Sequence, residues 1–545
     1  MGVQIRPIEE RDIEQVIALY RKVYGKDFPF KEFYQPAWVR KGIYDDGIAW
    51  SVAELEGRVV GSAAVMVNVG DHDDLLGEFG RLVVDPECRG QGVGEALGKA
   101  RIARIGKRIE FGFGEARVVH VGAQKIMLRL GFAPIGFEPM KYVLRHRESA
   151  VFFGRLFGNA AKLRKNNPQV IKAVYALGAR ALANMGLEPD LIVKAEVEAY
   201  PTDLEYEVVE LQNDWSHRLL RIEQGRVART EVFGGMHLDY GFLKIKSANA
   251  AYLVAREHGV PVGAVGFAVD DIDRKCRIFE LIEFDDAVKG FLLRTVTERA
   301  ATQYGCDYIE VDVNAHSPRL QYTLDLLGYV PVAYCPAMVF HAVERLDVVK
   351  MAKVVCDYDP GEIELLDEAK PIFELVNGSV LEKKKGVEID GVMARIGIFD
   401  GLGGAAVARL GRICTEKRFS AGERVFAEGS AGAEMYVVTK GCIEIHDEAR
   451  PSDAGVRGAE PIAAVCAGEI FGEFALIDSL PRSMSAVCTE DTTVLVITKR
   501  DFEQLMAHHP EVGARVYRNI AETLVGRLRR TNVKLTDLKM KYGEG

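Results

Sequence analysis

A glycine-rich stretch supplies the strongest chemical signal in this chain. It follows a predicted strand that ends at Val83 and Val84, and its residues are Arg89, Gly90, Gln91, Gly92, Val93 and Gly94. Glycines let backbone amides approach a ligand closely, and the helix predicted from Gly92 adds its positive end, so the stretch suits a pyrophosphate. A nucleotide P-loop is excluded because no Gly-Lys-Ser/Thr is present. The dinucleotide fingerprint is excluded because Glu95 and Leu97 stand where its last glycine is required.

The spacing Arg-x-x-Gly-x-Gly over Arg89, Gly92 and Gly94, preceded by Asp85-Pro86, resembles the acetyl-CoA loop of the GNAT acyltransferase superfamily. The resemblance covers about residues 1–145 and includes Leu-Gly-Phe near its end. It implies a mixed α/β fold, acetyl-CoA as the cosubstrate and an amine as the acceptor. It also assigns acetyl-CoA contacts to the two valines and to the whole glycine-rich stretch.

The catalytic groups are less clearly marked than the cofactor loop. In this superfamily the amine attacks the thioester directly, so the amine must lose a proton and the departing thiolate must gain one. Glu78, which opens the predicted strand before the loop, is the first candidate base, and His120, which ends a strand predicted at 117–121, is the second. Both also fit structural roles, as an exposed carboxylate and a packed histidine. Met127 stands where relatives often carry a tyrosine that protonates the thiolate, so the proton donor is left open.

An internal repeat extends the α/β interpretation to the middle of the chain. Ala53–Gly61 lines up with Ala255–Gly263, and Gln124–Pro139 lines up with Gln321–Pro336, in the same order and at similar offsets (202 and 197 residues). Such self-similarity predicts a duplicated α/β domain. In the second copy, Asp285-Asp286 falls where the pyrophosphate loop should be, and its charge would repel a phosphate. We therefore expect a scaffold or a wall of the substrate groove rather than a second active site.

A third motif combines a carboxylate, a cation and a short helix. Its predicted ligand-binding residues are Gly472, Glu473, Phe474, Ala475, Arg482 and Ser483. A cyclic nucleotide needs backbone amides and a cation for its phosphate, and an acceptor for its ribose hydroxyl. The helix predicted from Glu473 offers the amides, Arg482 offers a permanent planar cation, and Glu473 offers the acceptor oxygens.

The run Phe-Gly-Glu-Phe-Ala-Leu followed by Pro-Arg-Ser resembles the phosphate-binding cassette of cyclic nucleotide-binding domains, and the resemblance covers about residues 396–533. In the last helix, Thr531 and Asn532 resemble the adenine-contacting positions of catabolite activator proteins, which implies cAMP rather than cGMP. A solvated helix face is the alternative interpretation. Only about a dozen residues follow, too few for the DNA-reading helix-turn-helix of those proteins, so we expect no nucleic-acid partner.

Composition places the chain among folded multidomain proteins. With 70 Lys plus Arg against 79 Asp plus Glu the net charge is −9, so no overall cationic field indicates nucleic acid or anionic lipid. Nine scattered cysteines without a CxxC pair argue against a disulfide scaffold and a zinc ribbon, and we predict no metal site. The charged start, MGVQIRPIEERD, lacks the apolar run of a signal peptide, and no apolar stretch is long enough to cross a membrane. We expect a cytoplasmic protein without membrane contact.

The predicted architecture is multidomain α/β plus β: two GNAT-like mixed α/β domains followed by a cyclic nucleotide-binding β-barrel, or jelly roll, with flanking helices. A helical segment is expected from about 150 to 185. The predicted boundaries are 1–148 for the acetyltransferase domain, 149–200 for a helical connector, 201–345 for the degenerate copy, 346–390 for a helical linker, 391–535 for the cyclic nucleotide domain and 536–545 for a tail.

The sequence therefore predicts a bacterial-type N-acetyltransferase that transfers an acetyl group from acetyl-CoA to an amine, such as a protein lysine, under allosteric control by cAMP. The fusion resembles the cAMP-regulated protein lysine acetyltransferases, which place the cyclic nucleotide domain first. Two alternatives remain: a small-molecule amine N-acetyltransferase under the same control, and a non-catalytic cAMP-sensing adaptor. The acceptor, the acyl chain, the direction of control and the oligomeric state stay open.

Overall fold

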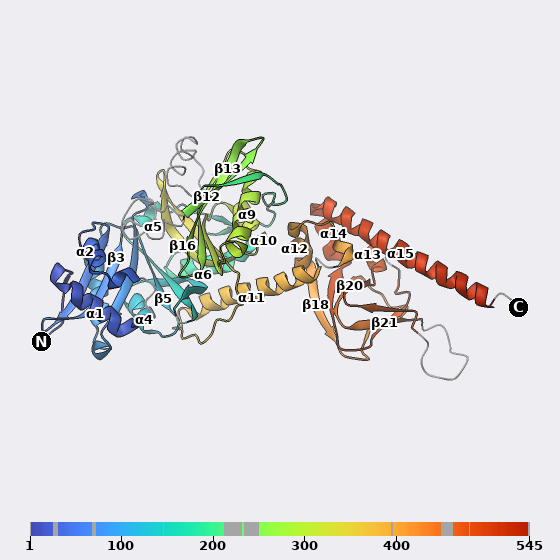
Figure 1. Ribbon diagram of the computed structural model, residues 1–545, viewed down its shortest axis with the longest axis horizontal. Coiled ribbons are helices and arrows are strands. Elements are labelled where there is room, and N and C mark those ends of the chain that lie inside the picture. The colour runs from blue at the N-terminus through green and yellow to red at the C-terminus, as the bar shows by residue number, and fades with distance from the viewer. Residues whose placement is uncertain are drawn as a thin grey trace. The chain divides into compact units, whose positions relative to one another are not determined.

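The chain forms two compact units, Met1–Lys383 and Lys384–Gly545 (Figure 1). The computed structural model describes residues 2–25, 31–67, 72–144, 146–211, 231–233, 250–393, 396–447, 461–478 and 480–542. The first unit holds both copies of the repeat, and the second holds a β-barrel with helices. The fold class predicted from the sequence is thereby confirmed.

The first copy builds a sheet with helices on both faces. Its strands are β1 (Gln4–Pro7), β2 (Ile48–Leu55), β3 (Arg58–Met66), β4 (Leu76–Val84), β5 (Phe111–Arg117), β6 (Ala133–Val143) and β7 (Arg147–Leu156). Its helices are α1 (Ile13–Tyr24), α2 (Pro36–Ile43), α3 (Val93–Ile105) and α4 (Gly122–Arg129). Successive strand residues point to opposite faces. Accordingly, Trp50 and Val52 pack with α1 and α2, whereas Ala53 packs with α3.

The second copy repeats this order of elements. It consists of β12 (Ala250–Glu257), β13 (Val260–Asp270), β14 (Lys275–Glu283), α9 (Val288–Thr302), β15 (Tyr308–Asn314), α10 (Pro318–Leu326), β16 (Val330–His341) and β17 (Glu344–Val354). Even an irregularity recurs, because the strand register shifts after Ala53 in β2 and after Ala255 in β12. The repeat in the sequence is therefore a repeat of structure.

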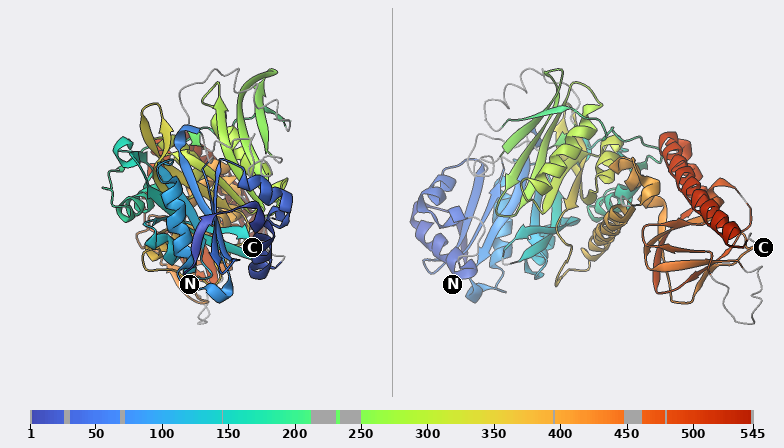
Figure 2. Two further views of the ribbon diagram at one scale, coloured as in Figure 1. Left: turned by 90° about the vertical axis from the view of Figure 1, so that its left-hand side faces the viewer. Right: turned by 45° about the vertical axis from the view of Figure 1, so that its right-hand side comes forward.

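The two copies share one fifteen-stranded sheet (Figure 2). Its order is β1-β2-β3-β4-β5-β7-β6-β16-β17-β15-β14-β13-β12-β10, with β10 at Glu207–Leu211 and with β11 (Val232–Phe233) attached to β15. The copies join where Gly136 on β6 pairs with Ala333 on β16. A β-carbon on Gly136 would lie 2.2 Å from that of Ala333, so the close approach of the two strands requires glycine there.

The predicted helical segments begin as strands. The connector expected to be helical from about 150 starts with β7, which pairs with β5 and β6, and helix α6 (Lys172–Asn184) comes later. The linker expected to be helical from 346 starts within β17, and helix α11 (Lys370–Met393) follows. Both strands are buried on both faces, so neither shows the alternation of apolar and polar residues that identifies a strand. In β17 even charged residues, Asp347 and Lys350, are buried.

The strand predicted at 117–121 is also wrong, because β5 ends at Arg117. The residues of β5 before Arg117 include Gly112 and Gly114, and because glycine is uncommon within strands, this part of β5 was not predicted. Both glycines make room for neighbouring side chains: a β-carbon on Gly112 would lie 2.7 Å from Phe157, and one on Gly114 would lie 2.8 Å from Met127.

The second unit is a barrel of two four-stranded sheets, ordered β18-β25-β20-β23 and β19-β24-β21-β22. The strands are β18 (Cys414–Phe419), β19 (Arg424–Phe426), β20 (Glu434–Lys440), β21 (Cys442–His446), β22 (Ala463–Cys466), β23 (Ile470–Phe471), β24 (Ser485–Cys488) and β25 (Thr492–Thr498). The helices are α12 (Gly404–Ile413), α13 (Phe474–Ile477), α14 (Lys499–His508) and α15 (Pro510–Tyr542). A disulfide joins Cys442 to Cys466 on neighbouring strands, which the scattered cysteine pattern did not indicate.

Within the described part of the chain, no helix combines the length and apolar character needed to cross a membrane.

Candidate functional site

The glycine-rich loop joins β4 to α3, as the sequence predicts. Gly90 and Gly92 have φ of +77° and +80°, a left-handed conformation that glycine adopts without strain. Gly92 is the N-cap of α3, and the first amides of a helix have no partner within it. Arg89 is exposed, whereas Val83 and Val93 are buried beneath the loop. The loop thus presents its backbone and one cation to solvent, an arrangement suited to a pyrophosphate.

The remaining residues of the cofactor loop also include both exposed and buried positions. Gln91 is exposed and its side-chain amide donates to the Glu87 carbonyl, Val84 is half-buried at the end of β4, and Gly94 is buried against Ile126 of α4.

A slot opens between β4 and β5 beside this loop. The two parallel strands pair only from Leu76 to Glu78 on β4 and from Phe111 to Phe113 on β5. Beyond Glu78, β4 shifts register against β3, and Arg81 takes a φ of +56°. Both strands continue without further pairing to each other, so the facing edge of β4 keeps backbone groups that an amide-containing chain can bond.

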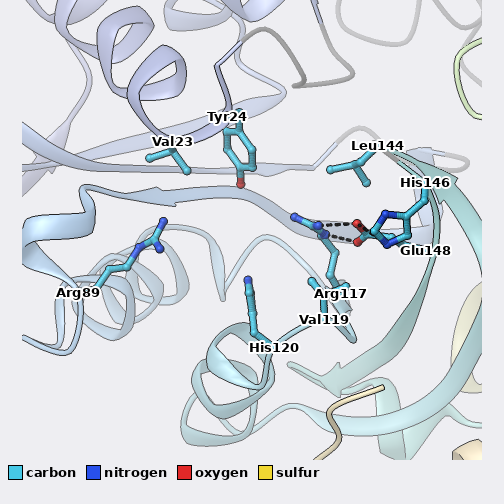
Figure 3. Close-up of a pocket in the computed structure, with 9 residues that line it drawn as sticks. All are labelled: Val23, Tyr24, Arg89, Arg117, Val119, His120, Leu144, His146 and Glu148. Carbon is cyan, nitrogen blue, oxygen red and sulfur yellow. Dashed lines mark hydrogen bonds and ion pairs between the residues drawn. The ribbon is translucent and has the colours of Figure 1, made fainter. Parts of the chain in front are cut away.

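A pocket of about 380 Å³ lies beyond the ends of these two strands (Figure 3). It is lined by Val23, Tyr24, Arg89, Arg117, Val119, His120, Leu144, His146 and Glu148. Figure 3 shows the Tyr24 hydroxyl, the Arg117 guanidinium and the His120 ring directed toward a common space. The pocket therefore brings together two residues predicted from the sequence, Arg89 and His120.

Four polar lining residues were missed by the sequence analysis: Tyr24, Arg117, His146 and Glu148. Arg117 donates to both carboxylate oxygens of Glu148, at 2.6 and 2.7 Å, and His146 Nε2 lies 3.8 Å from the same carboxylate. They come from α1, from the end of β5 and from the turn and strand after β6. No short motif joins these segments, so the sequence carries no local signal for them.

Tyr24 is a candidate proton donor in this pocket. Burial raises the pKa of its hydroxyl, although the charges of Arg117 and Arg89 act the other way. The hydroxyl is therefore protonated at neutral pH. Met127, which stands at the usual tyrosine position, is buried against Gly114 of β5 instead.

The two predicted catalytic residues lie in different surroundings. Glu78 lies on β4 at the last residue that pairs with β5, beside the slot, and its carboxylate forms an ion pair with Arg81. Burial alone would lower the pKa of Arg81, but Glu78 raises it above its usual value, so the guanidinium stays charged. His120 is exposed in the turn between β5 and α4 rather than at the end of a strand.

The corresponding loop of the second copy differs in length. It runs from 284 to 287, between β14 and α9, whereas that of the first copy runs from 85 to 92. The slot also differs, because Val232 and Phe233 of β11 pair with Val313 and Asp312 on the part of β15 that lies beyond its pairing with β14. The chain itself thus fills the position that is open in the first copy.

The charges at the start of α9 also make this loop unsuited to a pyrophosphate. The Lys289 ammonium is buried and lies 2.7 Å from Glu231, 3.1 Å from Glu283 and 2.9 Å from Asp286. Three carboxylates around one ammonium leave no cationic surplus for a pyrophosphate, in agreement with the expectation of a scaffold.

In the second unit, Arg482 reaches the start of the predicted cassette. Its guanidinium donates to the Gly472 carbonyl at 3.3 Å and to the Glu434 carbonyl at 2.8 Å. The same group lies over the Phe426 ring, 4.3 Å from the centroid. Gly432 makes this position possible, because a β-carbon there would lie 2.0 Å from Arg482 Nε. The cation for a phosphate is therefore held in place by the barrel.

Glu473 is buried and bonds to the long helix α15. Arg527 Nη1 donates to its carboxylate at 2.6 Å, and Nη2 donates to the Ile470 carbonyl. Thr531 lies one turn farther along α15 on the face of Arg527, and it and Asn532 are exposed. The helix face predicted to contact the base thus continues from a residue that contacts the cassette.

Two of the other cassette residues, Phe474 and Ala475, lie on the short helix α13. Ala475 is buried, Phe474 is half-exposed, and Ser483 is exposed next to Arg482.

Two known protein families match parts of this chain. Residues 45–134 match the acetyltransferase (GNAT) domain, and residues 416–509 match the cyclic nucleotide-binding domain. The chain contains both domains. The match to the GNAT domain includes the glycine-rich loop, Glu78 and His120, and the match to the cyclic nucleotide-binding domain includes Glu473 and Arg482.

Relatives of the cyclic nucleotide-binding domain include transcriptional regulators. The chain is 30% identical over 151 residues (28% of its length) to a CRP-like cAMP-activated global transcriptional regulator of Mycobacterium tuberculosis and spans 63% of that protein. It is 32% identical over 115 residues (21% of its length) to the cyclic AMP receptor protein of Thermus thermophilus and spans 49% of it. A solved cyclic nucleotide-binding domain from Methylobacillus flagellatus is 25% identical, with a TM-score of 0.25, over 28% of this chain and 84% of that one.

Proposed function

We propose that this chain is an N-acetyltransferase that transfers an acetyl group from acetyl-CoA to an amine, a protein lysine in the first instance, and that cAMP bound to the second unit controls it. The observation that carries the proposal is the pocket in which Arg89 of the cofactor loop meets Tyr24 and His120. The pocket lies beyond an open slot between β4 and β5, so a CoA thioester bound in the slot would place its acetyl end next to the polar residues of the pocket.

Each group has a task in this reaction. Acetyl-CoA supplies the activated acetyl group, whose carbonyl carbon bonds to the amine nitrogen as the carbon–sulfur bond breaks. The Gly90–Gly94 amides and Arg89 bind the pyrophosphate. Glu78 takes the amine proton, and the Tyr24 hydroxyl gives a proton to the departing thiolate. The Arg81 ion pair keeps the Glu78 carboxylate beside the slot.

Control by cAMP follows from the bond between Glu473 and Arg527. A ribose hydroxyl that donates to Glu473 competes for the carboxylate that Arg527 binds, so nucleotide binding repositions α15. Helix α11 continues from one unit to the other, with Ile372 and Val376 in the core of the first and Met393 in the core of the second. We propose that this helix transmits the effect of the nucleotide, and coupling between two sites typically amounts to about 1–3 kcal/mol.

The test is release of free CoA from acetyl-CoA with a lysine-containing acceptor, with and without cAMP. We expect turnover in the wild type and a loss of at least about 10-fold in kcat/KM in Arg89→Ala, because the cation for the pyrophosphate is gone. Arg11→Ala is the matched control, since Arg11 is exposed and forms an ion pair with its neighbour Glu9. Equal turnover in Arg89→Ala and Arg11→Ala would contradict the proposal.

A second candidate function, a cAMP-sensing adaptor that binds acetyl-CoA without turnover, is favoured by Met127 at the tyrosine position and by the Glu78–Arg81 ion pair. It predicts acetyl-CoA binding with no release of CoA for any amine.

A further inference from the structure

A buried ionic cluster joins the second copy to the first. Lys141 Nζ lies 2.8 Å from Glu138, 3.0 Å from Glu115 and 3.1 Å from Glu310. Glu310 belongs to β15 of the second copy, and the other three residues belong to β5 and β6 of the first. Lys141, Glu138 and Glu310 are buried, whereas 25% of the Glu115 side chain is exposed. Of these four groups, Glu115 is the one that reaches solvent.

Glu115 lies along β5 between the part of the strand that pairs with β4 and the pocket residue Arg117. It lies two residues beyond Phe113, where β5 stops pairing with β4, and two residues before Arg117, which lines the pocket. Alternate strand residues share a face, so the three side chains share one face of β5. The opposite face is covered by α4, whose Met127 packs against Gly114. Glu115 therefore lies between the slot and the pocket.

Neighbouring cations keep Glu115 ionised. Burial alone would raise the pKa of Glu115, but the charges of Lys141 and Lys275 lower it to about 2. Tyr142 also donates its hydroxyl to the carboxylate. At neutral pH Glu115 is thus a fixed anion, which suits it to binding a cation rather than to accepting a proton.

The second copy also braces the segment that lines the pocket. The carboxylate of Asp273, in the turn between β13 and β14, accepts from the Val143 amide at 3.1 Å, and its carbonyl accepts from Arg147 at 2.8 Å. Lys275 bonds to Asp273 at 2.7 Å and lies over the Tyr142 ring, 4.9 Å from its centroid. These contacts lie beside the pocket residues Leu144 and His146, which follow β6, and Glu148, which lies on β7.

We propose that Glu115 binds the ammonium group of a cationic acceptor as it enters the pocket, and that the second copy positions Glu115 through Lys141 and Glu310. The proposal rests on the function proposed above and names its acceptor class, a primary alkylammonium. It also gives the second copy a task that does not require a cofactor: Glu310 and Lys141 act as positioning residues for the acceptor site of the first copy.

The test measures binding of a small cationic probe to the full chain saturated with CoA. The probe is Nα-acetyl-lysine amide, and its neutral counterpart is Nα-acetyl-norleucine amide. We expect the wild type to bind the lysine probe more tightly than the norleucine probe, and Glu115→Gln to weaken the lysine probe by at least 10-fold without changing the norleucine probe. Glutamine keeps the shape of glutamate and removes its charge, so the variant is expected to fold.

The positioning role is tested in the second copy. Glu310→Gln should weaken the lysine probe by at least 3-fold, whereas Glu344→Gln should leave it unchanged, because Glu344 is a half-exposed carboxylate that pairs with Lys165 at the far end of β17. Loss of binding to both probes alike would indicate a general distortion and would overturn the proposal.

Acetyl-CoA binding and CoA release, measured on the same preparations, separate the two claims. If the wild type binds acetyl-CoA but does not prefer the lysine probe, or if Glu115→Gln binds it as the wild type does, the acceptor assignment is wrong while the proposed function stands. If acetyl-CoA does not bind, the proposed function fails, and the charge preference of the probes then decides on Glu115 alone.

Discussion

Arg527 of α15 donates a 2.6 Å hydrogen bond to the carboxylate of Glu473, the residue expected to accept from the ribose of a cyclic nucleotide. Both groups lie in the second unit, and the carboxylate is buried. The predicted ligand site and the long helix therefore share a charged contact, and we propose that a bound nucleotide acts on the helix there.

Replacing Arg527 should separate binding from control. In Arg527→Ala we expect cAMP to bind still, because Arg482 and the cassette are unchanged, but the effect of cAMP on acetyl-CoA affinity should be lost. Calorimetric titrations of acetyl-CoA with and without cAMP measure this difference. Arg518→Ala is the control on the same helix, since Arg518 is exposed and forms an ion pair with Glu522. Full cAMP coupling in Arg527→Ala would rule out this contact as the link.

Gly432 should be required for the phosphate cation. A β-carbon there would lie 2.0 Å from Arg482 Nε, so Gly432→Ala must displace the guanidinium from its place over Phe426. We expect cAMP affinity to fall by at least about 10-fold, since a charge-assisted contact is worth roughly 1.5–3 kcal/mol. Gly526→Ala provides a control, because a β-carbon on Gly526 meets nothing within 4 Å. Unchanged cAMP affinity in Gly432→Ala would show that Arg482 does not bind the phosphate.

Tyr24 should affect turnover more than binding. Tyr24→Phe removes the proton donor but keeps the ring, so kcat should fall by about 10²-fold while acetyl-CoA affinity stays constant. Burial raises the pKa of Tyr24, so its proton is present at neutral pH and is lost only as the pH rises through that raised value. The alkaline limb of the wild-type kcat profile should therefore lie above pH 10 as far as this group determines it. Tyr175→Phe, an exposed tyrosine on α6, is the control; a kcat loss equal in both variants would contradict the assignment.

Glu138 should make the first unit less stable as the pH rises. Burial raises the pKa of Glu138 to about 8, although Lys141 acts the other way. A carboxyl group whose pKa is raised by folding contributes stability that is complete below its unfolded pKa, near 4.5, and is lost as the pH rises to about 8. Glu138→Gln, which mimics the protonated form, should therefore flatten the decline in melting temperature between pH 5 and 8. Scanning calorimetry of both chains measures this, and equal slopes would show that Glu138 ionises normally.

Short motifs indicated the parts of the sites that lie on single loops. Arg89 to Gly94 and Gly472 to Arg482 were identified because a phosphate needs amides and a cation close together in sequence. The pocket residues Tyr24, Arg117 and Glu148 were not, since three segments far apart in the chain place them side by side.

Strand burial explains the errors in secondary structure. β7 and β17 are buried on both faces and were mistaken for helices. β5 was not recognised over its first residues because it contains two glycines, which make room for the side chains of Phe157 and Met127. The sequence also did not predict that the two copies share one sheet. The repeat predicted two copies, but their junction depends on the contact of Gly136 with Ala333, to which no local pattern points.

The most direct test of the whole account is calorimetric titration of acetyl-CoA into the full chain, with and without saturating cAMP. We expect one acetyl-CoA per chain, bound at the Gly92 loop, because β11 and Lys289 occupy the equivalent place in the second copy. We also expect the affinity for acetyl-CoA to change by about 5- to 150-fold with cAMP. No binding of acetyl-CoA in either state, or two molecules per chain, would contradict the account.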